Sequence, residues 1–168
     1  MLWRKKVVEP YIPPQKRGVK STASINGHPI HPLLIPFPIA FLIGALLTDL
    51  AYLQGIGDPF WARASLWLIA AGFISGVLAA IFGLTDFVTI ERVREHKIAW
   101  IHFIGNATAL VIALINWQLR LSSSPESVPL WGLILSVITA AILLITGWAG
   151  GELAYRHKIG VIDDTDTE

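Results

Sequence analysis

Four long stretches without a single charged residue are the feature that most constrains how this chain can fold. Each is close to the roughly 20 residues that an α-helix needs to cross the hydrocarbon core of a bilayer. They occupy residues 33–48, 66–84, 98–119 and 127–151. Composition agrees, since 54% of the 168 residues are hydrophobic and only 15% are charged, where soluble chains carry about 25%. We therefore expect an all-α integral membrane protein with helices over residues 32–53, 59–88, 94–120 and 127–157.

The connectors between these stretches are short and polar. Short connectors place consecutive helices side by side in opposite directions, which predicts an up-down-up-down four-helix bundle. Asp58-Pro59 and Ser124-Pro125 each put a capping residue before a proline, and we expect the second and fourth helices to begin there. Pro36 and Pro38 fall in the first turns of the first helix, where the missing amide donors would lack an intrahelical partner in any case.

The cations are distributed unequally between the two ends of this bundle. The net charge of +1 is close to balanced, so the chain has no general affinity for nucleic acid. Only Arg63 and Arg120 fall on one side, and the other eleven Lys and Arg fall on the side of both termini. The positive-inside rule therefore predicts that both termini are cytoplasmic. We expect a basic, proline-rich tail over 1–27, a four-helix domain over 28–160 and an acidic tail over 161–168.

Small residues at helical spacing indicate which helix faces pack together, because close approach of backbones drives helix association in lipid. In the second helix, Gly72, Gly76 and Gly83 share one face with Asp86. The fourth helix ends in a GxxxG pair, Gly147 and Gly151. We expect these five glycines to mark packing faces.

All five histidines fall toward the predicted cytoplasmic end of the bundle. An ionisable or polar group within a spanning segment is costly and marks a candidate functional site. His102 lies deepest, with Asn106 one turn away on the same face, and is the first candidate for cofactor binding. His31, His157 and His28 are the further candidate ligands.

Three acids, Asn106 and His96 are expected to have roles other than cofactor binding. Asp86 and Glu152 are expected either to form salt bridges with Arg92, Arg94 or Arg156, or to hydrogen-bond a histidine ligand and fix its orientation. Asn106 is expected to have this second role. His96 lies in a charged segment and is expected to be solvated. Asp49 lies near the outer end of the first helix, where capping or solvation would explain it.

Two kinds of cofactor suit a histidine cluster in a membrane bundle. Haem b needs one or two imidazoles from facing helices and an apolar slot, and a non-haem ion such as Fe or Zn would take two or three imidazoles with a carboxylate. The chain has no cysteine, and no HExxH, ExxH pair or phosphate-binding loop can be read from it. It is therefore not expected to be an enzyme by itself. The alternative is a cofactor-free structural or assembly subunit. Expected partners are the lipid bilayer together with a redox protein, a membrane complex or a second copy of the chain.

Several motifs also resemble a widespread bacterial family of small four-helix membrane proteins catalogued as a domain of unknown function. They are HPIHPLLIPFPIA from His28, GLTD from Gly83, HxxxN from His102, and GWAGGELAYRHKIGV from Gly147. The resemblance spans about residues 28–161 and implies a multi-pass protein of the bacterial inner membrane. Some relatives look fused to Rieske-type iron–sulfur domains, which implies electron transfer. His31, Asp86, His102, Asn106 and His157 match position by position, whereas Pro36 stands where relatives often carry another histidine.

Overall fold

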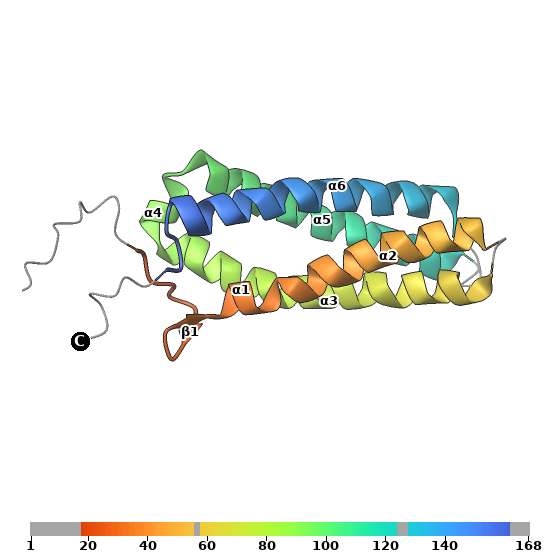
Figure 1. Cartoon of the computed structure of the whole chain (residues 1–168), viewed down its shortest axis with the longest axis horizontal. Helices are drawn as coiled ribbons and strands as arrows, with labels where there is room; N and C mark the ends of the chain where they lie inside the picture. Colours follow the sequence, from red (N-terminus) through yellow and green to blue (C-terminus); the bar gives the residue numbers. More distant parts are fainter. Residues whose placement is uncertain (1–17, 56–57, 124–127, 162–168) are drawn as a thin grey trace, which may run out of the picture.

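The computed structural model of the protein describes residues 18–55, 58–123 and 128–161. These residues form a bundle of four long helical segments preceded by a small hairpin (Figure 1). The elements are β1 Ser24–Ile25, β2 His28–Pro29, α1 Ile30–Leu34, α2 Pro36–Gln54, α3 Pro59–Thr89, α4 Glu91–Arg94, α5 Lys97–Ser122, α6 Leu130–Gly151 and a π-helix, η2, Glu152–Arg156. The all-α, up-down-up-down prediction is confirmed.

The bundle consists of two antiparallel helical hairpins. The first pairs α1 and α2 with α3, and the second pairs α5 with α6. We call the end that carries α1, α4 and η2 the histidine end, and the end where α2 meets α3 and α5 meets α6 the opposite end (Figure 1). Both described ends of the chain, residues 18–29 and 157–161, lie at the histidine end (Figure 1).

Some of the helix starts agree with those predicted from the sequence. The Asp58 carboxylate accepts a hydrogen bond from the amide of Phe60 at 2.9 Å and caps α3 as predicted. Ser124-Pro125 lies outside the described residues, and α6 begins at Leu130, after Pro129. The helix predicted from residue 94 begins at Lys97, because Glu91–Arg94 forms a separate turn, α4.

A proline divides the first membrane segment. The α1 helix ends before Ile35, and α2 starts at Pro36. Pro36 and Pro38 have no amide hydrogen to donate, so two backbone bonds are missing at this junction. The backbone of Ile35 nevertheless stays helical, and its amide donates to the carbonyl of His31 at 3.1 Å. The two pieces therefore continue as one segment of 25 residues, Ile30–Gln54.

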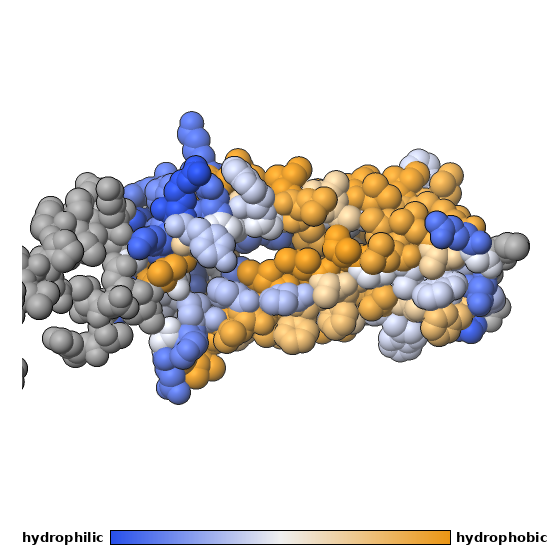
Figure 2. Space-filling view, viewed as in Figure 1, coloured by the Kyte–Doolittle hydropathy of each residue, from blue (hydrophilic) through white to orange (hydrophobic). Residues whose placement is uncertain are grey.

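The outside of the bundle is apolar and its inside is lined by small residues. Four helical segments are long and apolar enough to cross a membrane, and hydrophobic residues cover their middle parts (Figure 2). Large side chains such as Trp67 and Leu144 are more than 70% exposed, whereas Ala45, Ala109 and Ala149 are almost completely buried. This inversion suits a protein whose surface meets lipid and whose helices approach closely through small residues.

Three of the five predicted packing glycines hold close contacts. A Cβ atom would meet Leu42 at Gly72, Leu110 at Gly76 and His31 at Gly83, each within 3 Å.

The GxxxG prediction for the fourth helix is wrong within the monomer. Nothing lies within 4 Å of a Cβ at Gly147, and at Gly151 only Tyr155 of the following turn does. The tight positions of the second hairpin are instead Gly105, against Thr146, and Gly150, against His102. The spacing identified a glycine-rich face, but the rotation of the helix placed its neighbour Gly150 in the interface.

Residues 18–27, the described part of the tail expected over 1–27, are folded against the bundle. Asn26 and Gly27 both have positive φ, as required in the two-residue turn that joins β1 to β2. Val19 pairs with Ile159 in a parallel bridge, so the two ends of the described chain meet. Residues 1–17 and 162–168 lie outside the described residues.

Candidate functional site

His31 stands at the start of the first hairpin and is held by α3. Its Nδ1 lies 2.7 Å from the carbonyl oxygen of Ala79. A carbonyl can only accept, so Nδ1 carries the hydrogen and Nε2 of the neutral ring keeps its lone pair. One turn further along α3, a Cβ at Gly83 would come within 2.8 Å of the His31 ring. Glycine at this position therefore leaves the space that the imidazole occupies.

His102 is held in the same way by the second hairpin. Its Nδ1 lies 2.8 Å from the carbonyl oxygen of Thr146, and a Cβ at Gly150 would come within 2.9 Å of its ring. Asn106 supports this arrangement, because its Oδ1 accepts from the hydroxyl of Thr146 and its Nδ2 donates to the carbonyl of His102. Asn106 thus contacts both the histidine residue and the residue that orients it.

The two imidazoles face each other between the hairpins. Their ring centroids are 6.1 Å apart and their planes are almost perpendicular, at 87°. Both line an almost wholly apolar cavity that encloses about 70 Å³. In the space-filling view an opening lies between the two hairpins toward this end (Figure 2). Within the described chain neither Nε2 has a hydrogen-bond partner, so both lone pairs are available at the cavity.

The two halves of the site are related by a near-constant shift along the chain. His102 follows His31 by 71 residues, and each ring is bound by a carbonyl one turn before its glycine: Ala79 before Gly83, and Thr146 before Gly150. The two hairpins therefore hold their histidines by equivalent contacts.

His28 and His157, the two remaining candidate ligands, lie away from this cavity. His28 is exposed, and its ring bonds to the carbonyl of Asn26 within the turn. His157 packs against His96, with ring centroids 3.9 Å apart. The expectation that His96 is solvated is wrong, because its Nε2 is buried and has no hydrogen-bond partner. The charged residues around His96 predicted solvation, but the carboxyl-terminal segment folds back and places His157 against His96.

The hydrogen bonds of Asp86 to the described residues go to the segment before the first helix and not to a histidine or an arginine. Its Oδ2 accepts from the hydroxyl of Ser21 at 2.6 Å, and its Oδ1 accepts from the amides of Thr22 and Ala23 and from the Thr22 hydroxyl. Both predicted roles for Asp86, salt bridge and histidine orientation, are therefore replaced by a clamp on residues 21–23. The sequence alone could not reveal it, since the partners lie 63–65 positions away.

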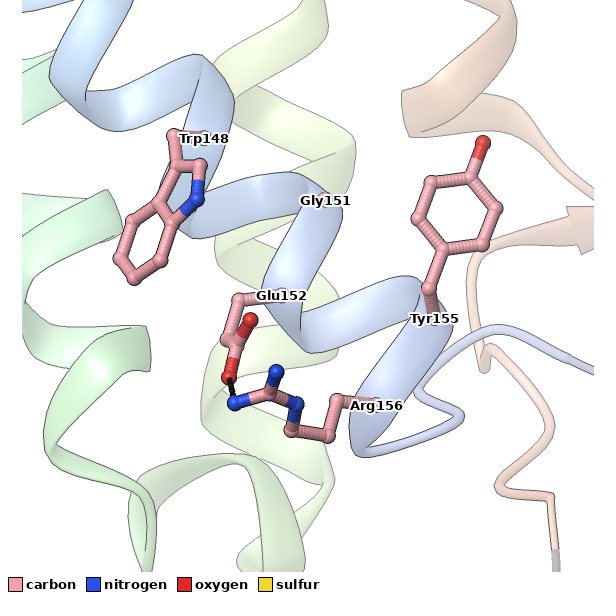
Figure 3. Close-up of a pocket in the computed structure, with 5 residues that line it drawn as sticks. All are labelled: Trp148, Gly151, Glu152, Tyr155 and Arg156. Atoms are coloured by element: carbon pink, nitrogen blue, oxygen red, sulfur yellow. Dashed lines mark ion pairs between the residues drawn. The ribbon is translucent and has the colours of Figure 1, made fainter.

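Glu152 takes the simpler of its two predicted roles. Its carboxylate pairs with Arg156 one turn later, at 2.7 Å. Figure 3 shows this ion pair in a shallow surface pocket, with Trp148 on one side and Tyr155 directed away from it. The Arg156 side chain is 75% exposed, so the pair contributes little to stability.

The opposite end of the bundle contains a polar cluster that the sequence interpretation missed. The guanidinium of Arg120 donates to Asp49 at 2.7 Å, and the two side chains are only 2% and 0% exposed. Asn116 and Ser136 accept further bonds from Arg120. The prediction that Asp49 caps the helix or is solvated is therefore wrong. Asn116 and Arg120 lie one turn apart on one face of a membrane helix, and this spacing could have indicated a polar cluster in the sequence.

Fold and surface together define a class: a polytopic membrane protein whose two helical hairpins enclose polar side chains at each end and present apolar side chains to lipid. The chain belongs to the family described as "Predicted membrane protein (DUF2231)", whose family profile matches residues 27–163. That family is a domain of unknown function, as the sequence motifs implied. No curated protein and no solved structure matches the chain significantly.

Proposed function

We propose that this protein is a membrane electron-transfer protein in which His31 and His102 bind a redox metal group, with haem b as the group of choice. The observation that carries the proposal is the pair of opposed imidazoles, one from each hairpin, each with Nδ1 bonded to a backbone carbonyl. Histidine ligands of metals commonly donate their second nitrogen in this way, which fixes the tautomer and the ring orientation.

The donor set fits haem iron. His31 and His102 would supply its two imidazole ligands, one from each hairpin, and their ring centroids are 6.1 Å apart. Bound haem supplies a one-electron couple. The protein supplies ligand orientation through Ala79 and Thr146, and an apolar lining that limits access of water.

The cavity between the hairpins must be large enough to hold haem. The cavity encloses about 70 Å³, whereas cofactor sites usually measure about 300–1,000 Å³. Binding of a macrocycle therefore requires the hairpins to separate further beside His31 and His102. The present cavity accommodates a bare ion without that movement, so a non-haem metal such as Fe or Zn is the second candidate. Such an ion needs more than two ligands. Water would have to supply the others, because no group of three metal-binding side chains occurs among the described residues.

Visible spectra of the detergent-purified protein, oxidised and reduced, with metal analysis of the same sample, test the proposal. We expect a Soret band that is lost in His102→Ala and in His31→Ala but retained in His96→Ala and His28→Ala. Absence of a Soret band after the purified protein has been incubated with excess haem and separated from the unbound haem would rule out haem. Substoichiometric metal in the same sample would rule out the bare ion.

We also propose that the histidine end faces the cytoplasm of a bacterial inner membrane. The support is the distribution of eleven of the thirteen Lys and Arg residues to that side. Because the chain has no cysteine, single cysteines at Lys158 and Gln54 can be labelled with an impermeant maleimide in intact spheroplasts. We expect labelling at position 54 only, and labelling at 158 alone would reverse the orientation.

A further inference from the structure

A surface pocket lies on one face of the last helical segment, at the histidine end. It measures about 440 Å³, and its lining comes entirely from the end of α6 and from η2. The lining residues are Trp148, Gly151, Glu152, Tyr155 and Arg156. Their spacing of three or four positions places them on one side of the helix. None of them lines the cavity between His31 and His102, so the pocket is a separate site.

The pocket lies where the helix leaves the membrane. The apolar span that contains α6 ends at Arg156. Trp148 and Tyr155 are both largely exposed, and these two residue types gather where a membrane meets water. Further into the span, Leu144 and Val137 are exposed on the same face of α6. A lipid in the pocket would therefore have its headgroup at the membrane surface and its acyl chains against an apolar helix face.

Glycine leaves the floor of the pocket open. Only the ring of Tyr155 comes within 4 Å of a Cβ at Gly151. Figure 3 shows Trp148 on one side of the Glu152–Arg156 ion pair and Tyr155 on the other, with its ring turned away from the pair. The two charged side chains are therefore accessible between the aromatic residues.

The ion pair has unused bonding capacity for both signs of charge. Nη1 of Arg156 lies 2.7 Å from Oε1 of Glu152, and among the described residues these two side chains bond only to each other. A guanidinium has five N–H donors, and a carboxylate has about four acceptor positions. Arg156 can thus donate to a phosphate, for which guanidinium is well suited, while Glu152 accepts from a cation.

We propose that this pocket binds the headgroup of phosphatidylethanolamine, with the phosphate on Arg156 and the primary ammonium on Glu152. The pair carries no net charge, so it matches a zwitterionic headgroup better than an anionic one. An ammonium that retains its N–H groups can donate to the carboxylate. The quaternary ammonium of phosphatidylcholine cannot donate, and its preferred site is an aromatic cage, which the orientation of Tyr155 does not form.

Native mass spectrometry of the full-length protein in mild detergent tests the proposal. The protein is titrated with three dioleoyl lipids that differ only in headgroup: phosphatidylethanolamine, phosphatidylcholine and phosphatidylglycerol. We expect the first to bind most tightly. Arg156→Gln should weaken its binding about fivefold, as for an exposed charge contact, and Glu152→Gln should remove the preference over phosphatidylcholine. Lys97→Gln is the control, because Lys97 is an exposed cation at the same end but outside the pocket, and it should change neither value.

Three results would overturn the proposal. The first is equal binding of phosphatidylethanolamine and phosphatidylcholine to the wild type, and the second is tighter binding of phosphatidylglycerol. Both come from the unaltered protein and hold even if a substitution prevents folding. The third is an unchanged headgroup preference in Glu152→Gln whose circular dichroism matches that of the wild type. Haem or metal content has no part in these measurements, so their outcome is independent of the function proposed for His31 and His102.

Discussion

Arg120 donates from Nη2 to Oδ2 of Asp49 across 2.7 Å, and the two residues are 71 positions apart in the chain. The same interval separates His31 from His102. Each hairpin thus contributes one member of a polar pair at each end of the bundle. Along one helix the two positions, His31 and Asp49, are roughly 27 Å apart at 1.5 Å per residue. The pairs therefore join the hairpins near both membrane surfaces.

Removing one partner of the buried ion pair should destabilise the bundle strongly. Asp49→Ala leaves the guanidinium of Arg120 buried without its counter-ion, and we expect a loss of about 3–5 kcal/mol in the free energy of unfolding. The double variant Asp49→Leu, Arg120→Met buries no charge and should recover most of that loss. Thermal denaturation in detergent provides the measurement. A double variant less stable than either single one would contradict this account.

The glycines beneath the imidazoles should control cofactor binding. Ala at position 83 or 150 would place a methyl group within 3 Å of a histidine ring, so the ring must move. We expect Gly83→Ala and Gly150→Ala to reduce the bound haem or metal while helix content stays the same. Gly151→Ala is the matched control, because only the Tyr155 ring lies within 4 Å of its Cβ position, at 3.9 Å, and Gly151 does not line the cavity. Equal cofactor content in all three variants would show that the rings do not need this space.

The clamp on residues 21–23 should depend on a single carboxylate. Asp86→Ala removes the acceptor of four hydrogen bonds, and we expect a stability loss of about 1–3 kcal/mol, since bonds to charged groups are stronger than average. Amide hydrogen exchange at Thr22 and Ala23 should become faster.

Glu152→Ala serves as the comparison for this clamp. It removes only the ion pair with Arg156, whose side chain is 75% exposed, so exchange at Thr22 should not change. Protection of Thr22 that survives in Asp86→Ala would contradict the clamp.

Stability of metal-free protein should fall as the solution becomes acidic. The pKa of His96 is lowered in the folded protein by burial, by His157 and by Arg92, so the unfolded chain binds more protons between the folded pKa and the ordinary value of 6.5. The free energy of unfolding therefore decreases as the pH drops below 6.5 and levels off below the folded pKa. Melting temperatures between pH 8 and 5, with EDTA present, should show a smaller pH dependence in His96→Gln than in the wild type.

The helices and their membrane character follow from local properties of the chain. Charge-free length determines that residues 66–84 span a bilayer, and Asp58 before Pro59 determines where α3 begins. Gly83 and His102 could also be selected from the sequence, because helical spacing alone places them on the faces of small or polar residues. These features need only the geometry of one helix.

Contacts between elements depend on helix rotation and on register between hairpins, which no single segment specifies. Gly150 rather than Gly147 packs against a histidine because α6 is turned by one residue from the expected face. Asp86 binds residues 21–23, and Asp49 meets Arg120, because the fold brings distant positions together. The sequence alone therefore determined four apolar spans with histidines gathered at one end. The tertiary structure decided that His31 faces His102 and that His96 faces His157.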